Sequence, residues 1–137
     1  MDGREAAQRP AQGIPRRVLN PRIFVLAGPS GVGKGSIAGA LQRRVPRLWL
    51  SRSWTTRPPR TGEPPDAYVF VEAPSRQAQE ERLRGRGDRE DVIARRLAAA
   101  PEEERAGRAL ADHIVVNADL DRAVEEVTGI LESRRRD

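Results

Sequence analysis

The chain has 137 residues, of which 25 are basic and 20 acidic, giving a formal net charge of +5. It has no cysteine and one histidine, which excludes a disulfide scaffold, a thiol nucleophile and a metal site built from several histidines. No apolar run approaches the roughly 18 residues that span a membrane, and no secretory signal is visible, so we expect a cytoplasmic protein.

The beginning of the chain lacks the pattern of a folded segment. Residues 1–20 are rich in Gly, Pro, Gln and Arg and show no apolar periodicity. Such a composition does not bury enough apolar surface to fold. We therefore predict a disordered arm over residues 1–20, followed by one domain over residues 21–137.

The next segment begins with a buried strand. Residues 23–27 form a short continuous apolar run, as expected of a parallel strand covered on both faces. A glycine-rich turn follows, and then a helix over residues 36–44 that Pro46 ends. Residues 48–50 are apolar again and predict a second strand.

The middle of the chain changes from turns to regular structure. Residues 51–66 contain four prolines, which excludes a packed helix or a central strand. Residues 67–71 predict a third strand, and a polar helix follows over residues 75–84, with Ser75 as its N-cap.

The last third of the chain predicts helices around one more strand. Residues 90–100 predict a helix, and Pro101 begins a further helical segment because proline is favoured in the first turn. Residues 113–116 predict a fourth strand, and residues 119–133 an amphipathic helix. Strands that alternate with helices indicate an α/β fold with a parallel sheet of about four strands.

A phosphate-binding motif follows the first strand. Residues 28–34 read G-P-S-G-V-G-K and open a helix. Successive backbone N–H groups of such a loop surround an anion, and the lysine reaches the β- and γ-phosphates. Lys34 is also the only lysine of the chain, and an ordinary glycine-rich turn is the less favoured interpretation. The residues predicted to bind the phosphates are Gly28, Ser30, Gly31, Val32, Gly33, Lys34, Gly35 and Ser36.

The motif departs from the strict pattern at one position. Gly35 follows the lysine where Ser or Thr is usual, and Ser36 comes one residue later. The hydroxyl that helps to hold Mg²⁺ is therefore displaced, which makes Ser36 a weak candidate metal ligand.

A second group of polar residues lies at 53–63, S-W-T-T-R-P-P-R-T-G-E. Arg57 and Arg60 stand three residues apart among prolines. Guanidinium groups match phosphate oxygens in pairs, so this segment predicts a preformed anion clamp. A solvated Arg/Pro loop in an arginine-rich protein is an equally weighted alternative on spacing alone.

Together, the loop and the clamp resemble the guanylate kinase family. Residues 22–63 are similar to the N-terminal part of that family, and the similarity resumes at Val69, with V-F-V-E-A-P-S, R-L-R-G-R-G and H-I-V-V-N-A-D-L-D-R-A. The resemblance covers most of residues 22–131. It implies a P-loop NTPase-like fold that moves the γ-phosphate of ATP to GMP with Mg²⁺.

The resemblance also implies roles for individual residues. Arg84 is excepted from the arginines of the lid, because a solvated face suits it better. The implied catalytic residues are Lys34, Arg82, Arg86 and Arg96, the residues for the GMP phosphate are Ser53, Arg57 and Arg60, and Asn117 lies on the adenine side.

One segment of the family is missing near residues 63–67. In guanylate kinases a long stretch lies there, and it carries the contacts to guanine and an acid that orients Mg²⁺. Glu72, at the end of a strand, is a weak substitute for that acid, and Asp66 a weaker one. The gap predicts reduced turnover and poor base specificity.

Three alternatives remain. The missing acid and the displaced serine favour a non-catalytic nucleotide-binding remnant. The net charge and Arg134–Arg136 suit nucleic acid, but aromatic residues make up only 4% of the chain and scattered arginine is compositional. A degenerate or misassembled product of a full-length kinase gene would have the same sequence.

Overall fold

The computed structural model describes residues 22–49 and 65–136. Strands and helices alternate along these residues, which confirms the α/β class. The predicted arm over 1–20 and most of the arginine–proline segment lie outside the described residues. The elements are β1 (Phe24–Ala27), α2 (Lys34–Arg44), β2 (Ala67–Glu72), α3 (Arg76–Gly85), α4 (Glu90–Leu110), β3 (His113–Val116) and α5 (Leu120–Arg136).

The sheet has three parallel strands in the order β1-β2-β3. The predicted second strand at residues 48–50 is wrong for its described part, because Leu48 and Trp49 belong to no strand. The chain turns just before them at Pro46 and at Arg47, whose φ is 63°. The two apolar residues that follow are too few for a ladder. In the described part of the chain, β1 therefore pairs with β2 alone.

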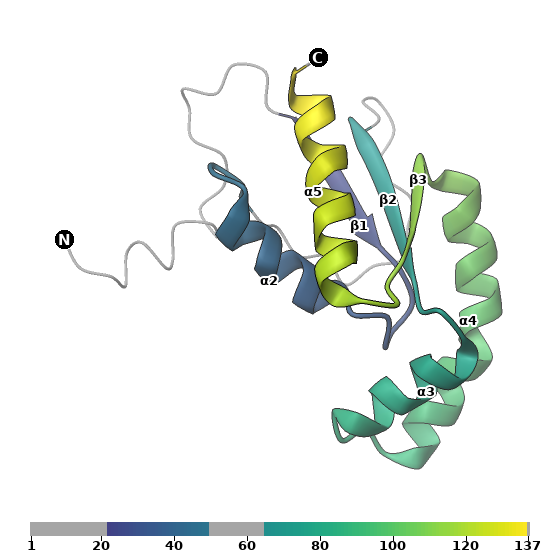
Figure 1. The fold of residues 1–137 in the computed structure, drawn as a ribbon. Coiled ribbons are helices and arrows are strands. Elements are labelled where there is room, and N and C mark those ends of the chain that lie inside the picture. The colour runs from purple at the N-terminus through teal and green to yellow at the C-terminus, as the bar shows by residue number, and fades with distance from the viewer. Residues whose placement is uncertain (1–21, 50–64, 137) are drawn as a thin grey trace.

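Helices cover both faces of this sheet, with α2 and α5 on one face and α4 on the other (Figure 1). Side chains of β2 alternate between these layers, as the pleat requires. Val69 and Val71 pack in the core with α2 and α5, whereas the Phe70 ring lies against Gly107 of α4. The buried core comprises Val32, Ile37, Leu41, Val45, Val69, Val71, Val115, Ala123, Val124, Val127 and Leu131.

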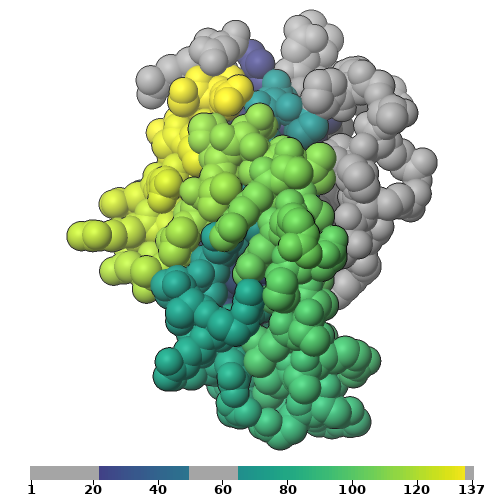
Figure 2. Space-filling model, turned by 90° about the vertical axis from the view of Figure 1, so that its right-hand side faces the viewer, coloured from purple at the N-terminus to yellow at the C-terminus, as the bar shows by residue number. Residues whose placement is uncertain are grey.

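Helix α4 runs without a break from Glu90 to Leu110, although Pro101 lies inside it. The sequence predicted two separate helical segments there. Proline removes one intrahelical hydrogen bond, but the neighbouring Ala100 is fully buried and Gly107 packs on the sheet, so tertiary contacts hold the helix together. Figure 2 shows α4 in green along one face of the molecule, with α3 in teal beside its N-terminal half.

The carboxyl ends of the strands lie at one edge of the sheet. The glycine-rich loop leaves β1 at this edge, and Asn117 follows β3 there. Open α/β sheets bind ligands at this edge, which makes it the place to look for a site. None of the described helices is long and apolar enough to cross a membrane.

Candidate functional site

The glycine-rich loop is braced by two segments distant in sequence. Gln79 of α3 donates from Nε2 to the carbonyl oxygen of Ser30 at 2.6 Å. Asn117 donates from Nδ2 to the carbonyl oxygen of Val32 at 2.9 Å, and Arg82 donates to the same oxygen at 3.4 Å. Two carbonyl groups of the loop are thus held from outside.

These bonds also orient the N–H groups of the loop. In a trans peptide the N–H points away from the preceding carbonyl, so the N–H groups of Gly31 and Gly33 point away from Gln79 and Asn117. Helix α2 begins directly after Gly33 and carries no acidic residue in its first turn. Backbone N–H groups and a helix N-terminus without a competing carboxylate form an anion-binding site.

A cleft of about 800 Å³ opens at this loop. Its volume lies in the range of small-molecule sites. Four cationic side chains and no carboxylate line it, so its chemistry suits a polyanion. The lining residues are Pro29, Ser30, Gly31, Gly33, Lys34, Gly35, Ser36, Arg82, Arg86, Arg96, Asn117 and Leu120.

The three arginines come from α3, its C-terminal turn and α4. Arg82 is tied to the loop region, because its Nη2 donates to the carbonyl oxygen of Asn117 at 2.8 Å. Arg86 donates from Nε to both carboxylate oxygens of Asp88 at 3.1 Å, and Arg96 lies 3.5 Å from the same carboxylate. Arg86 holds the pKa of Asp88 below its usual value. Asp88 thus fixes two arginines at the cleft.

Lys34 folds back onto its own loop and donates from Nζ to the carbonyl oxygen of Gly28. Burial lowers the pKa of Lys34, while Glu103 raises it and Arg86 lowers it further. Burial disfavours the charged form of an amine. An anion bound in the cleft would therefore stabilise the charged form of Lys34.

Asn117 supports the loop through a hydrogen bond and also lines the cleft. It is 4% exposed, and its backbone N–H donates to the carbonyl oxygen of Glu72 at 2.8 Å. Its Oδ1 is buried without a hydrogen-bond partner among the described residues. A buried acceptor that lacks a partner fits a ligand with a donor group.

The two carboxylates considered for Mg²⁺ are both engaged. Arg108 donates to Glu72 from Nε at 2.5 Å and from Nη2 at 3.0 Å. Asp66 accepts from the backbone N–H of Ile23 at 2.6 Å, at the end of β1 away from the loop. Neither carboxylate lines the cleft.

A self-contained metal site is also lacking in the described part of the chain, where no group of three or more His, Cys, Asp or Glu side chains gathers. Mg²⁺ usually needs only one or two protein ligands when nucleotide phosphates supply the rest. The hydroxyl of Ser36 at the cleft fits such a shared ion.

Other predicted residues divide into two groups. Ser53, Arg57 and Arg60 lie outside the described residues. Arg84 bonds Glu80 and Glu90 and does not line the cleft, as expected of a surface arginine.

Sequence reasoning missed three contributors to the loop and its surroundings. They are Gln79, Leu120 and Glu103, which lines a smaller pocket beside Ser30. For Gln79 the sequence held one signal, its spacing of four residues from the apolar Leu83, which places both on one face of a helix. The structure buries both side chains on that face of α3. Nothing in the sequence distinguished Glu103 from Glu102 and Glu104.

The chain is similar in sequence to known proteins. The family model described as guanylate kinase matches residues 63–134. Proteins named guanylate kinase from Synechococcus sp. (strain CC9902) and from Xanthomonas oryzae pv. oryzae (strain MAFF 311018) are 33% and 30% identical to this chain, over 79% and 82% of it and 94% and 89% of their own lengths. A guanylate kinase from Thermobifida fusca (strain YX) is 56% identical over 52 residues, which are 37% of this chain and 26% of that protein.

The comparison with the Synechococcus protein also measures the missing segment. It extends over 176 aligned positions, but 79% of 137 residues is only about 108, so about 68 positions of the relative face a gap in this chain. The alignment nevertheless covers 79% of this chain and 94% of the relative, and the family model matches more than half of the chain. This chain belongs to the guanylate kinase family.

Proposed function

We propose that this chain transfers the γ-phosphoryl group of ATP to GMP. The observation that carries the proposal is the cleft at the phosphate loop, which Lys34, Arg82, Arg86 and Arg96 line together. The proteins similar to it are named guanylate kinase. Phosphoryl transfer needs positioning and stabilisation of spread negative charge rather than covalent help from the protein, and this cleft supplies both.

In the proposed reaction an oxygen of the GMP phosphate bonds to the γ-phosphorus. The bond from that phosphorus to the β–γ bridging oxygen breaks, which leaves GDP and ADP. The loop N–H groups and Lys34 bind the phosphates of ATP, and Arg82, Arg86 and Arg96 stabilise the charge on the transferring group. Mg²⁺ that arrives with ATP neutralises part of the charge on the β- and γ-phosphates.

The test is ATP-dependent phosphorylation of GMP in the presence of Mg²⁺. We expect Lys34→Ala to lower kcat/KM by about 10²- to 10³-fold, because it removes a cation from the transferring phosphate. Arg84→Ala is the matched control, since Arg84 contacts Glu80 and Glu90 rather than the cleft. Equal activity of wild type and Lys34→Ala would contradict the proposal.

Acceptor choice is a separate part of the proposal. The gap of about 68 positions removes the region that carries base recognition in the guanylate kinase family. We therefore expect GMP, AMP, UMP and CMP to differ little as acceptors. A strong and efficient preference for GMP would show that base recognition survives without that region.

A non-catalytic nucleotide-binding protein is the second candidate. It is favoured by the engagement of Glu72 with Arg108 and of Asp66 with the start of β1, which leaves neither acid for the metal. Tight ATP binding without phosphate transfer, in a folded sample, would select this candidate over the kinase.

A further inference from the structure

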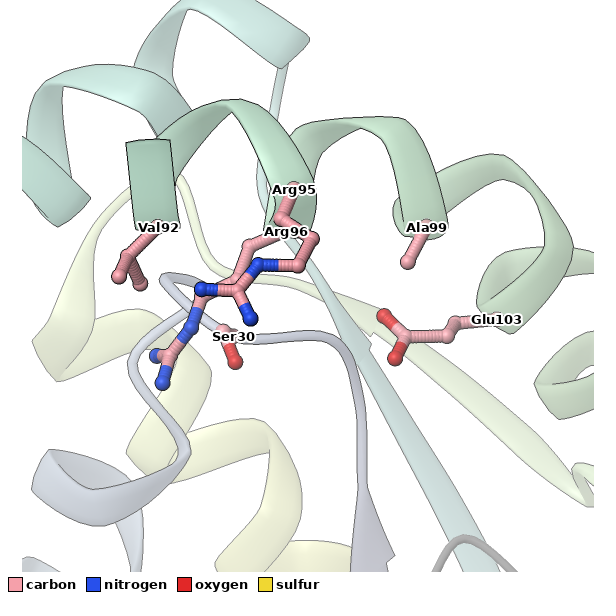
Figure 3. Close-up of a pocket in the computed structure, with 6 residues that line it drawn as sticks. All are labelled: Ser30, Val92, Arg95, Arg96, Ala99 and Glu103. Carbon is pink, nitrogen blue, oxygen red and sulfur yellow. The ribbon is translucent and has the colours of Figure 1, made fainter. Parts of the chain in front are cut away.

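A second pocket of about 260 Å³, the side pocket, lies beside the phosphate loop. It shares Ser30 and Arg96 with the large cleft, and the rest of its lining comes from α4. Figure 3 shows the guanidinium groups of Arg95 and Arg96 and the carboxylate of Glu103 directed into the space beside Ser30. A molecule in the side pocket would therefore lie next to the phosphates of a nucleotide in the cleft.

One stripe of α4 forms the wall of the side pocket. Val92, Arg96, Ala99 and Glu103 follow one another at helical spacing, which places them on one face of α4. Arg96 and Glu103 lie two turns apart, or about 10 Å along the helix axis, and the methyl group of Ala99 lies between them. The stripe thus offers a cation at one end, an apolar surface in the middle and a carboxylate at the other end.

Arg95 and Glu103 both face the side pocket but do not bond to each other. Neither side chain forms an ion pair or a hydrogen bond with any residue in the ranges 22–49 and 65–136. The neighbouring Glu102, in contrast, is paired with Arg105 on the surface. A guanidinium group only donates hydrogen bonds and an ionised carboxylate only accepts them. The two free groups therefore fit a ligand that carries an anion at one end and hydroxyl donors at the other.

We propose that the side pocket binds the ribose 5-phosphate portion of the acceptor nucleotide. Arg95 and Arg96 bind its phosphate, because guanidinium groups match phosphate oxygens in pairs. Glu103 accepts hydrogen bonds from the 2′- and 3′-hydroxyls of the ribose. The volume of about 260 Å³ is small for a site that encloses a whole ligand, so the base stays outside the pocket.

This assignment deepens the proposed function, on which it rests, by naming what the site recognises in the acceptor. Two guanidinium groups and one carboxylate leave the pocket cationic, as an anionic ligand requires. Arg96 lines both the pocket and the cleft, so it can contact the phosphates of both nucleotides. The site then selects by the sugar rather than by the base. A 2′-deoxyribonucleotide lacks one of the two donors and leaves the carboxylate of Glu103 partly unpaired.

The test measures the binding of GMP and of 2′-deoxy-GMP by calorimetry. The protein is first saturated with Mg²⁺ and a non-hydrolysable ATP analogue, so that the phosphate loop is occupied. We expect wild type to bind GMP about tenfold more tightly than 2′-deoxy-GMP, because one hydrogen bond to a charged group is lost. In Glu103→Ala the ratio of the two affinities should fall to about one. Glu102→Ala is the matched control and should keep the ratio of wild type, since Glu102 pairs with Arg105 on the surface.

A second variant tests the phosphate end of the pocket. Arg95→Ala should weaken the binding of GMP and 2′-deoxy-GMP alike, by about tenfold, because it removes a contact to the phosphate and none to the ribose. Arg105→Ala is its control, because Arg105 bonds Glu102 and lines neither pocket. Unchanged affinities in Arg95→Ala would overturn the inference.

The remaining outcomes are also decisive. Equal affinities of wild type for GMP and 2′-deoxy-GMP would overturn the inference. An equal loss of both affinities in Glu103→Ala would overturn it too, because Glu103 would then act only through its charge on Lys34, whose pKa it raises. If wild type shows the preference for ribose but transfers no phosphate to GMP, the proposed function alone fails, so the two failures are distinguishable.

Discussion

Close contacts at single residues shape the phosphate loop. Gly33 has a φ of 95°, and a Cβ there would lie 2.3 Å from Nδ2 of Asn117. Gly31 has a φ of 86° and packs against the side chain of Leu83, which is fully buried. These glycines are needed for both the left-handed backbone and the space that the bracing side chains occupy.

Replacement of Gly33 should therefore disturb both the fold and the binding of phosphate. We expect Gly33→Ala to lower the free energy of unfolding by about 1–3 kcal/mol, through backbone strain and displacement of Asn117. Gly35→Ala is the control for stability, because no atom lies within 4 Å of a Cβ at Gly35. Urea unfolding of both variants checks this, and equal stabilities would contradict it.

Helix α4 is the element that connects the sheet to the site. Arg108 in its last turns holds Glu72 at the end of β2, and Gly107 lies against the ring of Phe70. Arg96 and Glu103 on the same helix line the pockets at the loop. The packing of α4 on β2 therefore sets the position of groups that face the nucleotide cleft.

Two helical glycines provide a matched test of this packing. A Cβ at Gly107 would lie 2.0 Å from a ring carbon of the buried Phe70, whereas a Cβ at Gly129 of α5 meets nothing within 4 Å. We expect Gly107→Ala to lower the free energy of unfolding by about 1–3 kcal/mol, because the core is overpacked.

The control should change in the opposite direction. Gly129→Ala should raise the free energy of unfolding by about 0.5–1 kcal/mol, because alanine is the better helix former. Denaturant unfolding of the two variants gives both values. A Gly107→Ala protein as stable as Gly129→Ala would show that α4 does not pack tightly on Phe70.

At the scale of the whole molecule, acids paired with arginine connect stability to pH. Arginine partners hold the pKa values of Asp88, Glu90 and Asp91 below their usual values. Each of these carboxylates binds fewer protons in the folded than in the unfolded chain. Their contribution is complete above the unfolded pKa, which is near 3.8 for Asp and 4.5 for Glu, and is lost as the pH falls through the lower folded value.

We therefore expect the midpoint of thermal unfolding to fall as the pH is lowered from about 5 to about 2. Circular dichroism at a series of pH values measures it. In Asp88→Asn the fall should be shallower, because one of the titrating acids is gone. A midpoint that stays constant below pH about 4 would contradict the assignment of these ion pairs.

The sequence by itself determined the features that local chemistry dictates. Alternating apolar runs and helical patterns predicted β1, β2 and β3 and the helices around them, and Ser75 was identified as the N-cap of α3, where its Oγ accepts from the N–H of Ala78. The phosphate loop was readable because its glycines and Lys34 are adjacent along the chain. Contiguous residues carry their own backbone preferences, so such features need no knowledge of distant contacts.

Only the tertiary structure decided which distant side chains meet. Glu72 is bonded by Arg108, 36 residues away, and the carbonyl oxygen of Ser30 by Gln79, 49 residues away. Pro101 stays inside α4 because packing against the sheet outweighs the low helix propensity of proline. Leu48 packs against the core, yet neither Leu48 nor Trp49 joins a strand. Among three consecutive glutamates, the direction in which α4 lies over the loop brought Glu103 to the pocket, and no pattern in the chain encodes that direction locally.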